Sequence, residues 1–94
     1  MSIIVTYDVP SRHVDLKKSL FAKGYTDKIE HFQDGTYRNI YLPNTTLYHP
    51  TKSAQEARED MQTSTTALQI KLERCISMKW GPNWAAIYGE PFGS

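Results

Sequence analysis

The sequence predicts a small α+β domain, and three local patterns carry that prediction. An apolar run lies near the start of the chain, an Asp-Gly pair separates two β-rich stretches, and a helix-capping pattern opens a long helical stretch. The chain has 94 residues, of which 39% are hydrophobic and 22% are charged, as is typical of one folded domain. We expect this domain to span residues 1–92, with Gly93 and Ser94 as a cloning remnant.

Residues 2–8 predict the first strand. Ile3, Ile4 and Val5 form a continuous apolar run, which favours a strand covered on both faces, so we place it at the centre of the sheet. Pro10 then interrupts the strand pattern and Ser11 can cap a helix. This helix should end at Gly24, and its apolar stripe consists of Val14, Leu16, Leu20 and Phe21.

Two β-rich stretches follow, at residues 27–32 and 37–42. Asp34 and Gly35 lie between them and favour the positive φ angles of a tight turn, so the sequence predicts a β-hairpin. Residues 42–50 are predicted to be an ordered irregular loop, because Pro43 and Pro50 each remove a backbone donor.

A second helix is predicted to start at Ser53, which forms a capping box with Glu56. It should end near Leu68 or Gln69, and its thin core stripe consists of Ala54, Ala57, Met61, Ser64 and Leu68. Apolar residues at even positions within 70–80 then indicate a strand, and residues 84–88 indicate one more short strand.

The order β-α-β-β-α-β is that of the ferredoxin-like fold. Right-handed crossovers in this fold place the first strand beside the last core strand and put both helices on one face of an antiparallel sheet. The other face stays open for a partner. The extra C-terminal strand would add to a sheet edge or cross to a second protomer, so we expect a homodimer.

Charge and cysteine content limit the functional classes. The formal net charge is only +1, whereas a dedicated nucleic-acid-binding domain is strongly basic. A local basic patch is still compatible with this net charge. Cys75 is the single cysteine, which favours a reducing compartment. The sequence has neither a signal-peptide pattern nor an apolar run long enough for a bilayer, so we expect a cytoplasmic protein without membrane partners.

Residues 3–8, with the sequence IIVTYD, precede a turn and a helix that carries Arg12, Lys17 and Lys18. This segment resembles the small CRISPR adaptation protein family, the dimeric partner of the integrase, and its relatives in the virulence-associated protein D superfamily. That superfamily consists of ferredoxin-like dimers and includes orphan members and toxin-type endoribonucleases. The element order of the whole chain is similar to that of the family, but the sequence motif that the two share is only Tyr7-Asp8. Residues 37–43 replace the Ser-Val-Phe segment of the family and residues 44–49 have no counterpart, which implies an orphan relative.

Asp8 is the sharpest candidate site residue. Divalent cations prefer carboxylate oxygens, and one aspartate per chain becomes a two-carboxylate site at a symmetry axis. The resemblance implies the same role, because the family aspartate at this strand end lies near the dimer two-fold axis and holds a metal for phosphodiester hydrolysis. The expected cofactor is Mg²⁺ or Mn²⁺, with no organic cofactor. The alternative is a solvated turn aspartate before Pro10.

His13 and a basic cluster lie close to Asp8 in the sequence. His13 could reach the same cleft as a catalytic general acid or a phosphate contact, or it could be an exposed residue of the first helical turn. Arg12, Lys17 and Lys18 could neutralise the phosphates of RNA or DNA, or form a solvated helix face.

Other residues give weaker signals. No two histidines have the spacing of a zinc site, and Cys75 is more typical of a core residue than of a nucleophile. The aromatic residues could stack unpaired bases, but packing and dimerisation explain them as well. They are Tyr37, Tyr41, Tyr48, Trp80, Trp84 and Tyr88.

Three functional classes are open. The first, which the resemblance implies, is a nucleic-acid-binding homodimer with Asp8 of each chain at the axis, acting as a metal-dependent endonuclease of the endoribonuclease or toxin-like type. The second is a non-enzymatic dimeric interaction or regulatory module, which the near-neutral charge favours. A third class, a small-molecule enzyme or sensor, has only His31, Tyr41 and His49 as pointers.

Overall fold

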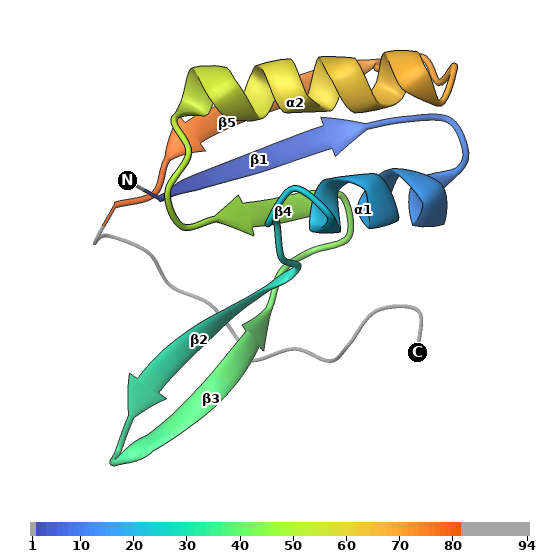
Figure 1. The fold of residues 1–94 in the computed structure, drawn as a ribbon. Helices are drawn as coiled ribbons and strands as arrows, with labels where there is room; N and C mark the ends of the chain where they lie inside the picture. The colour runs from blue at the N-terminus through green and yellow to red at the C-terminus, as the bar shows by residue number, and fades with distance from the viewer. Residues whose placement is uncertain (1, 82–94) are drawn as a thin grey trace.

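The computed structural model describes residues 2–81, which fold in the order β-α-β-β-β-α-β (Figure 1). Within these residues, five strands form two antiparallel sheets. Sheet A has the strand order β4-β1-β5, and sheet B is the hairpin of β2 and β3. The elements are β1 (Ile3–Asp8), α1 (His13–Phe21), β2 (Lys28–Gln33), β3 (Thr36–Tyr41), β4 (Thr46–His49), α2 (Ala54–Ala67) and β5 (Arg74–Lys79). The predicted α+β class is confirmed.

β1 is the central strand of sheet A, as its continuous apolar run predicts. It pairs antiparallel with β4 on one side and β5 on the other, so that Ile4 lies opposite both Tyr48 and Met78. Ile4 is buried on one face of the strand. The other face points toward the helices and carries three almost fully buried side chains, Ile3, Val5 and Tyr7.

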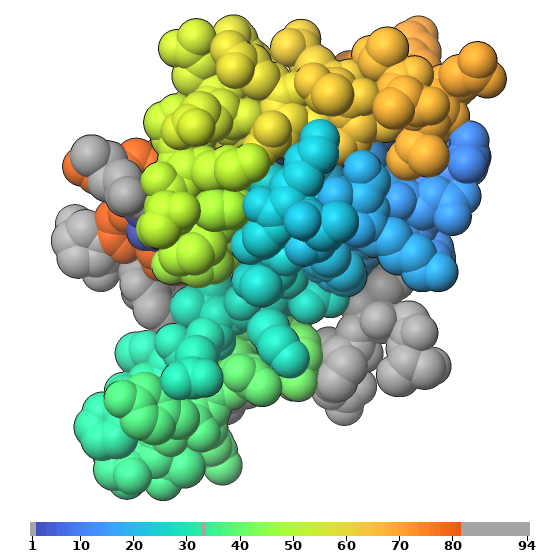
Figure 2. Space-filling model, in the orientation of Figure 1, coloured from blue at the N-terminus to red at the C-terminus, as the bar shows by residue number. Residues whose placement is uncertain are grey.

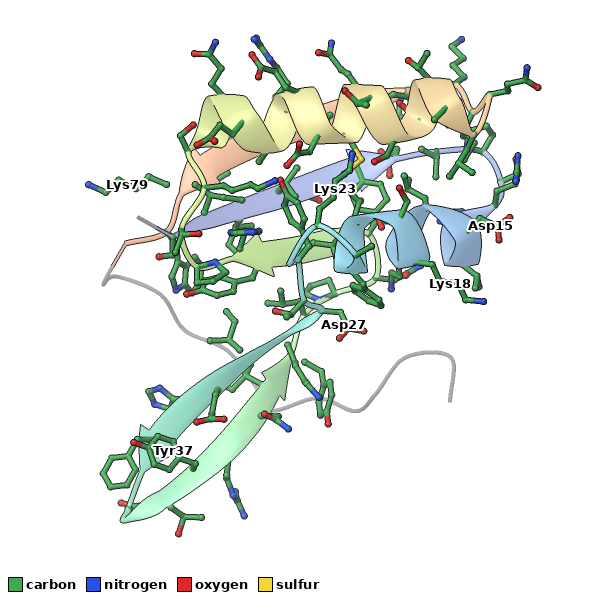
Figure 3. All side chains as sticks on the ribbon, in the orientation of Figure 1. Asp15, Lys18, Lys23, Asp27, Tyr37 and Lys79 are labelled. Carbon is green, nitrogen blue, oxygen red and sulfur yellow. The ribbon has the colours of Figure 1, made fainter. Side chains whose placement is uncertain are left out.

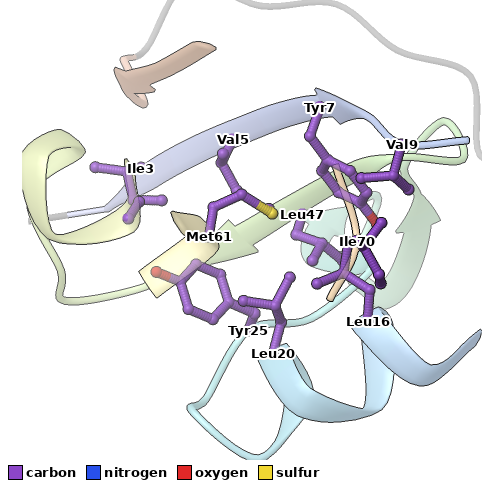
Figure 4. Packing of buried hydrophobic residues seen from close by; sticks show 11 residues of the cluster. Ile3, Val5, Tyr7, Val9, Leu16, Leu20, Tyr25, Leu47, Met61 and Ile70 are labelled. Atoms are coloured by element: carbon purple, nitrogen blue, oxygen red, sulfur yellow. The ribbon is translucent and has the colours of Figure 1, made fainter. Parts of the chain in front are cut away.

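The hydrophobic core lies between sheet A and the two helices (Figure 4). Leu16 and Leu20 enter it from α1, and Ala57 and Met61 enter it from α2, all without exposed surface. The two helices also pack against each other. Both helices therefore cover one face of sheet A, as predicted. Neither helix of residues 2–81 is long and apolar enough to cross a bilayer.

The capping box at the start of α2 is confirmed. The Ser53 hydroxyl accepts a hydrogen bond from the Glu56 backbone N–H at 3.1 Å, and the Glu56 carboxylate accepts one from the Ser53 N–H at 3.0 Å. These bonds lower the pKa of Glu56. The helix ends at Ala67, and Gln69 follows with a positive φ of 58°, so the predicted end is also confirmed.

α1 begins later than predicted. Its first residue is His13, and the N-cap residue is Arg12 in the left-handed conformation, with no side-chain cap bond. The prediction that Ser11 caps this helix is therefore wrong. A helix of nine residues presents only a narrow stripe to the core, so two of the predicted apolar positions are buried, Leu16 and Leu20, while two are exposed, Val14 and Phe21.

Residues 42–50 contain β4, so the predicted irregular loop is wrong. Pro43 and Pro50 lie just outside the strand and remove no donor from its ladder. Leu47 and His49 are buried and alternate with half-buried neighbours, which is the pattern of a strand with one covered face. Because β4 has only four residues and lies between two prolines, its alternating pattern is too short to predict a strand.

The predicted hairpin of β2 and β3 is confirmed, but it lies outside sheet A. Asp34 and Gly35 form its two-residue turn with φ angles of 53° and 76°. The hairpin projects from the body of the protein (Figures 1 and 2). Its root joins sheet A where Thr26 and Tyr48 exchange two backbone hydrogen bonds of 2.9 Å. The predicted single four-stranded sheet is therefore wrong, because β3 is largely exposed and offers the helices no apolar face.

β5 begins at Arg74, later than the even-numbered apolar pattern predicts. Ile70 and Leu72 precede the strand and pack in or against the core. Ile76 and Met78 lie on the face of sheet A that the helices leave open, where they are 56% and 47% exposed. The predicted strand at 84–88 lies outside the described residues.

Gly24 and Gly35 allow a matched test of packing beside the root of the hairpin. Both have a positive φ, which costs a residue with a Cβ about 1–2 kcal/mol. A Cβ at Gly24 would lie 2.8 Å from Nε2 of His49, whereas one at Gly35 would meet nothing within 4 Å. We expect Gly24→Ala to reduce the free energy of unfolding, measured by denaturant titration, more than Gly35→Ala does. Equal losses would contradict the close packing of His49 on Gly24.

Candidate functional site

Asp8 lies at the end of β1, and its side chain is on the open face of sheet A. Its Oδ2 accepts a hydrogen bond of 2.6 Å from Nε of Arg74, which lies directly opposite in the ladder with β5. The Asp8 side chain is 51% exposed, and that of Arg74 is more exposed still. The hydrogen bond and the charge of Asp8 raise the pKa of Arg74. Arg74 is the partner that the sequence did not identify.

A surface hollow of about 470 Å³ lies beside this ion pair, between β1 and β5. It is lined by Thr6, Tyr7, Asp8, Arg74, Cys75 and Ile76. The register places Thr6 opposite Ile76 and Ile4 opposite Met78 on the same face as Asp8. The open face therefore has a charged end at Asp8 and an apolar end at Met78.

β5 is an outer strand of sheet A within the described residues, and hollows flank it on both sides. The second hollow has a volume of about 370 Å³ and lies between β5 and the start of α2. Its lining comes from Ala54, Gln55, Arg58, Cys75, Ile76 and Ser77. An extended segment added at this edge would find space for side chains on either side.

The predicted metal site consists of Asp8 from two copies of the chain. Among residues 2–81, no group of three or more His, Cys, Asp or Glu side chains could hold a metal ion. The guanidinium of Arg74 also donates to Oδ2 of Asp8, so a cation bound at that oxygen would have to displace it.

His13 is not brought together with Asp8. It is the first residue of α1, which covers the other face of sheet A, and no hydrogen bond joins it to Asp8 in the described part of the chain. Its Nδ1 is buried without a hydrogen-bond partner. The role of His13 as a general acid therefore stays a prediction.

The two residues of the Tyr-Asp motif point to opposite faces of sheet A. Tyr7 is buried on the helix side, and its hydroxyl has no hydrogen-bond partner. Burial, and then the charge of Asp27, raises the pKa of Tyr7 to about 12. Tyr7 therefore contributes to the core, and of the two motif side chains only that of Asp8 is exposed.

The predicted basic cluster is divided between structural and exposed residues. Arg12 donates from Nε to Asp15 at 3.1 Å and from Nη1 to the carbonyl of Leu68 at 2.7 Å. It thus links the start of α1 to the carboxyl end of α2, where a cation is favourable. Lys17 is half-buried, and Lys18 points away from the body of the protein (Figure 3).

A polar cluster around Asp60 was not predicted. Tyr25 donates to Asp60 at 2.8 Å, and Lys52 forms an ion pair with the same carboxylate and lies 5.4 Å from the centre of the Tyr25 ring. Burial alone would raise the pKa of Asp60, but the bonds from Lys52 and Tyr25 lower it overall. Burial and the bond to Asp60 raise the pKa of Tyr25. No spacing in the sequence links these three residues.

Comparisons of the chain with known protein families, with curated proteins and with solved structures find no match.

Proposed function

We propose that this protein is a homodimer that binds and cleaves nucleic acid, with Asp8 of each copy in the seam between two open faces of sheet A. The observation that carries this proposal is that Asp8 shares its face with Ile76 and Met78, two large apolar side chains that are about half exposed. Exposed apolar surface of this kind is typical of an interface. A second copy that covers it would also enclose Asp8.

The edge of β5 supports the same assembly. We propose that this edge, between the two hollows, receives an extended segment of the second copy. We also propose that the fold is a ferredoxin-like variant. A ferredoxin-like sheet has four strands, and β5, β1 and β4 correspond to three of them. The fourth position, beside β4, is taken by the single residue pair Thr26–Tyr48. From this pair the chain continues into the projecting hairpin.

The proposed reaction is hydrolysis of a phosphodiester in RNA or DNA by a cytoplasmic enzyme. Water supplies the hydroxyl of the new phosphate end and the proton of the leaving oxygen. Two Asp8 carboxylates would supply the oxygen ligands that Mg²⁺ or Mn²⁺ prefers, and the bound cation would lower the pKa of water. Arg74 provides a guanidinium beside each carboxylate, a group suited to holding a phosphate.

Substitutions on the open face test the dimer. We expect the protein to have the mass of a dimer in light scattering, and Ile76→Glu with Met78→Glu to convert it to a monomer, because two carboxylates would be desolvated in the seam. Val14→Glu is the matched control, since Val14 is 66% exposed but lies on α1. A monomeric wild-type protein, or equal loss of the dimer with Val14→Glu, would contradict the proposed seam.

Asp8→Asn tests the proposed chemistry. We expect it to reduce Mn²⁺-dependent cleavage of RNA and DNA substrates to background, because it removes a carboxylate ligand, and to abolish Mn²⁺ binding in calorimetry while the dimer persists. Asp15→Asn is the control, because Asp15 also forms an exposed ion pair with an arginine. If the wild-type dimer neither binds Mn²⁺ nor cleaves any substrate, the enzymatic proposal fails and the dimer proposal stands.

A non-enzymatic dimeric interaction or regulatory module is the second candidate. It is favoured by the ion pair with Arg74, which already neutralises Asp8 within one chain. The exposed rings of Phe32 and Tyr37 also fit a docking role. They lie side by side near the tip of the hairpin, with ring centres 4.9 Å apart. In this case the dimer would form without any cleavage.

A further inference from the structure

The tip of the hairpin presents two aromatic rings to solvent. Phe32 of β2 and Tyr37 of β3 are partners in the ladder, with ring centres 4.9 Å apart and ring planes inclined by 54°. They are 57% and 67% exposed, and Tyr37 lies far from the helices and sheet A (Figure 3). A cross-strand aromatic pair stabilises a hairpin, but it uses only the surfaces that the two rings share. The outer ring faces are therefore available to a ligand.

Two carboxylates flank this aromatic pair. Glu30 lies two residues before Phe32 and therefore on the same face of the hairpin, whereas Asp34 belongs to the turn that follows β2. Both residues are exposed, and within residues 2–81 neither forms a salt bridge. The tip thus combines the π faces of two rings with negative charge that no neighbouring cation neutralises.

The two cations of the hairpin lie at its root or on its other face. Lys28 is four residues before Phe32, a separation of about 13 Å along a strand. Arg38 is the ladder partner of His31, so its side chain projects from the face opposite to the aromatic pair. The surface around the two rings therefore favours a cationic ligand, and it is unfavourable for the phosphates of a nucleic acid.

We propose that the tip of the hairpin binds an arginine side chain in an extended basic segment of a partner protein. A guanidinium over the ring of Phe32 or Tyr37 is attracted by the negative π face, and Glu30 or Asp34 accepts its N–H groups. The outer edges of β2 and β3 are unpaired in the described part of the chain, so the backbone of an extended segment can add there. This site needs neither Asp8 nor a dimer, and it goes beyond the function proposed above.

Titration of the full chain with a hexa-arginine peptide, followed by NMR, tests this site. We expect the signals that shift to be those of the tip, including the Gly35 amide and the rings of Phe32 and Tyr37. Phe32→Leu with Tyr37→Leu keeps two large apolar side chains but removes both π faces. It should raise the dissociation constant about 5-fold or more, since one exposed cation–π contact accounts for about 2–5-fold. Val14→Ala, at an exposed apolar position on α1, should leave the dissociation constant unchanged.

Glu30→Gln with Asp34→Asn tests the charges and leaves the rings in place. Asparagine tolerates the positive φ of this turn, so the hairpin should persist. We expect hexa-arginine to bind about two-fold or more weakly at low salt, whereas Glu59→Gln, at an exposed position on α2, should have no effect.

Three results would overturn the proposal. The first is that hexa-arginine leaves the signals of the tip unshifted. The second is that either double substitution binds the peptide as the wild type does, or no more weakly than its control. The third is that hexauridine shifts the same signals at a lower concentration than hexa-arginine, which would assign the tip to single-stranded RNA. Cleavage activity, which depends on Asp8, has no influence on any of these readouts.

Discussion

The burial of one face of β1 beneath both helices is the constraint on which the rest of the structure depends. Ile3, Val5 and Tyr7 fill the core, and the alternation of a strand then forces Asp8 onto the other face. The same register places Arg74 opposite Asp8 and brings Ile76 and Met78 beside it. The open face, with its charged end and its apolar end, is thus a consequence of how β1 packs.

Local signals in the sequence predicted the elements that local chemistry determines. The capping box, the Asp-Gly turn and the apolar run of β1 each specify their structure within a few residues. Predictions that depended on distant contacts were less successful. β4 is only four residues long between two prolines, and the hairpin leaves sheet A because a single residue pair at Thr26 holds its root.

In the candidate site, too, local features could be predicted from the sequence and long-range contacts could not. The exposure of Asp8 at a strand end could be predicted, because Pro10 and the end of the apolar run mark it. Its pairing with Arg74 and its separation from His13 could not, since the first depends on strand register and the second on which layer α1 occupies. The Asp60 cluster joins residues far apart in the chain, and no motif spacing indicates it.

The proposed function requires that two copies of Asp8 face each other across a dimer seam. The most direct measurement is cross-linking of Asp8→Cys in a Cys75→Ser background with a short bifunctional thiol reagent, because two carboxylates that share one metal ion keep their Cβ atoms farther apart than the roughly 4.5 Å of a disulfide. We expect the reagent to give a covalent dimer at position 8, and none with Asp15→Cys in the same background. Absence of the cross-link at position 8, or equal cross-linking at position 15, would contradict the account.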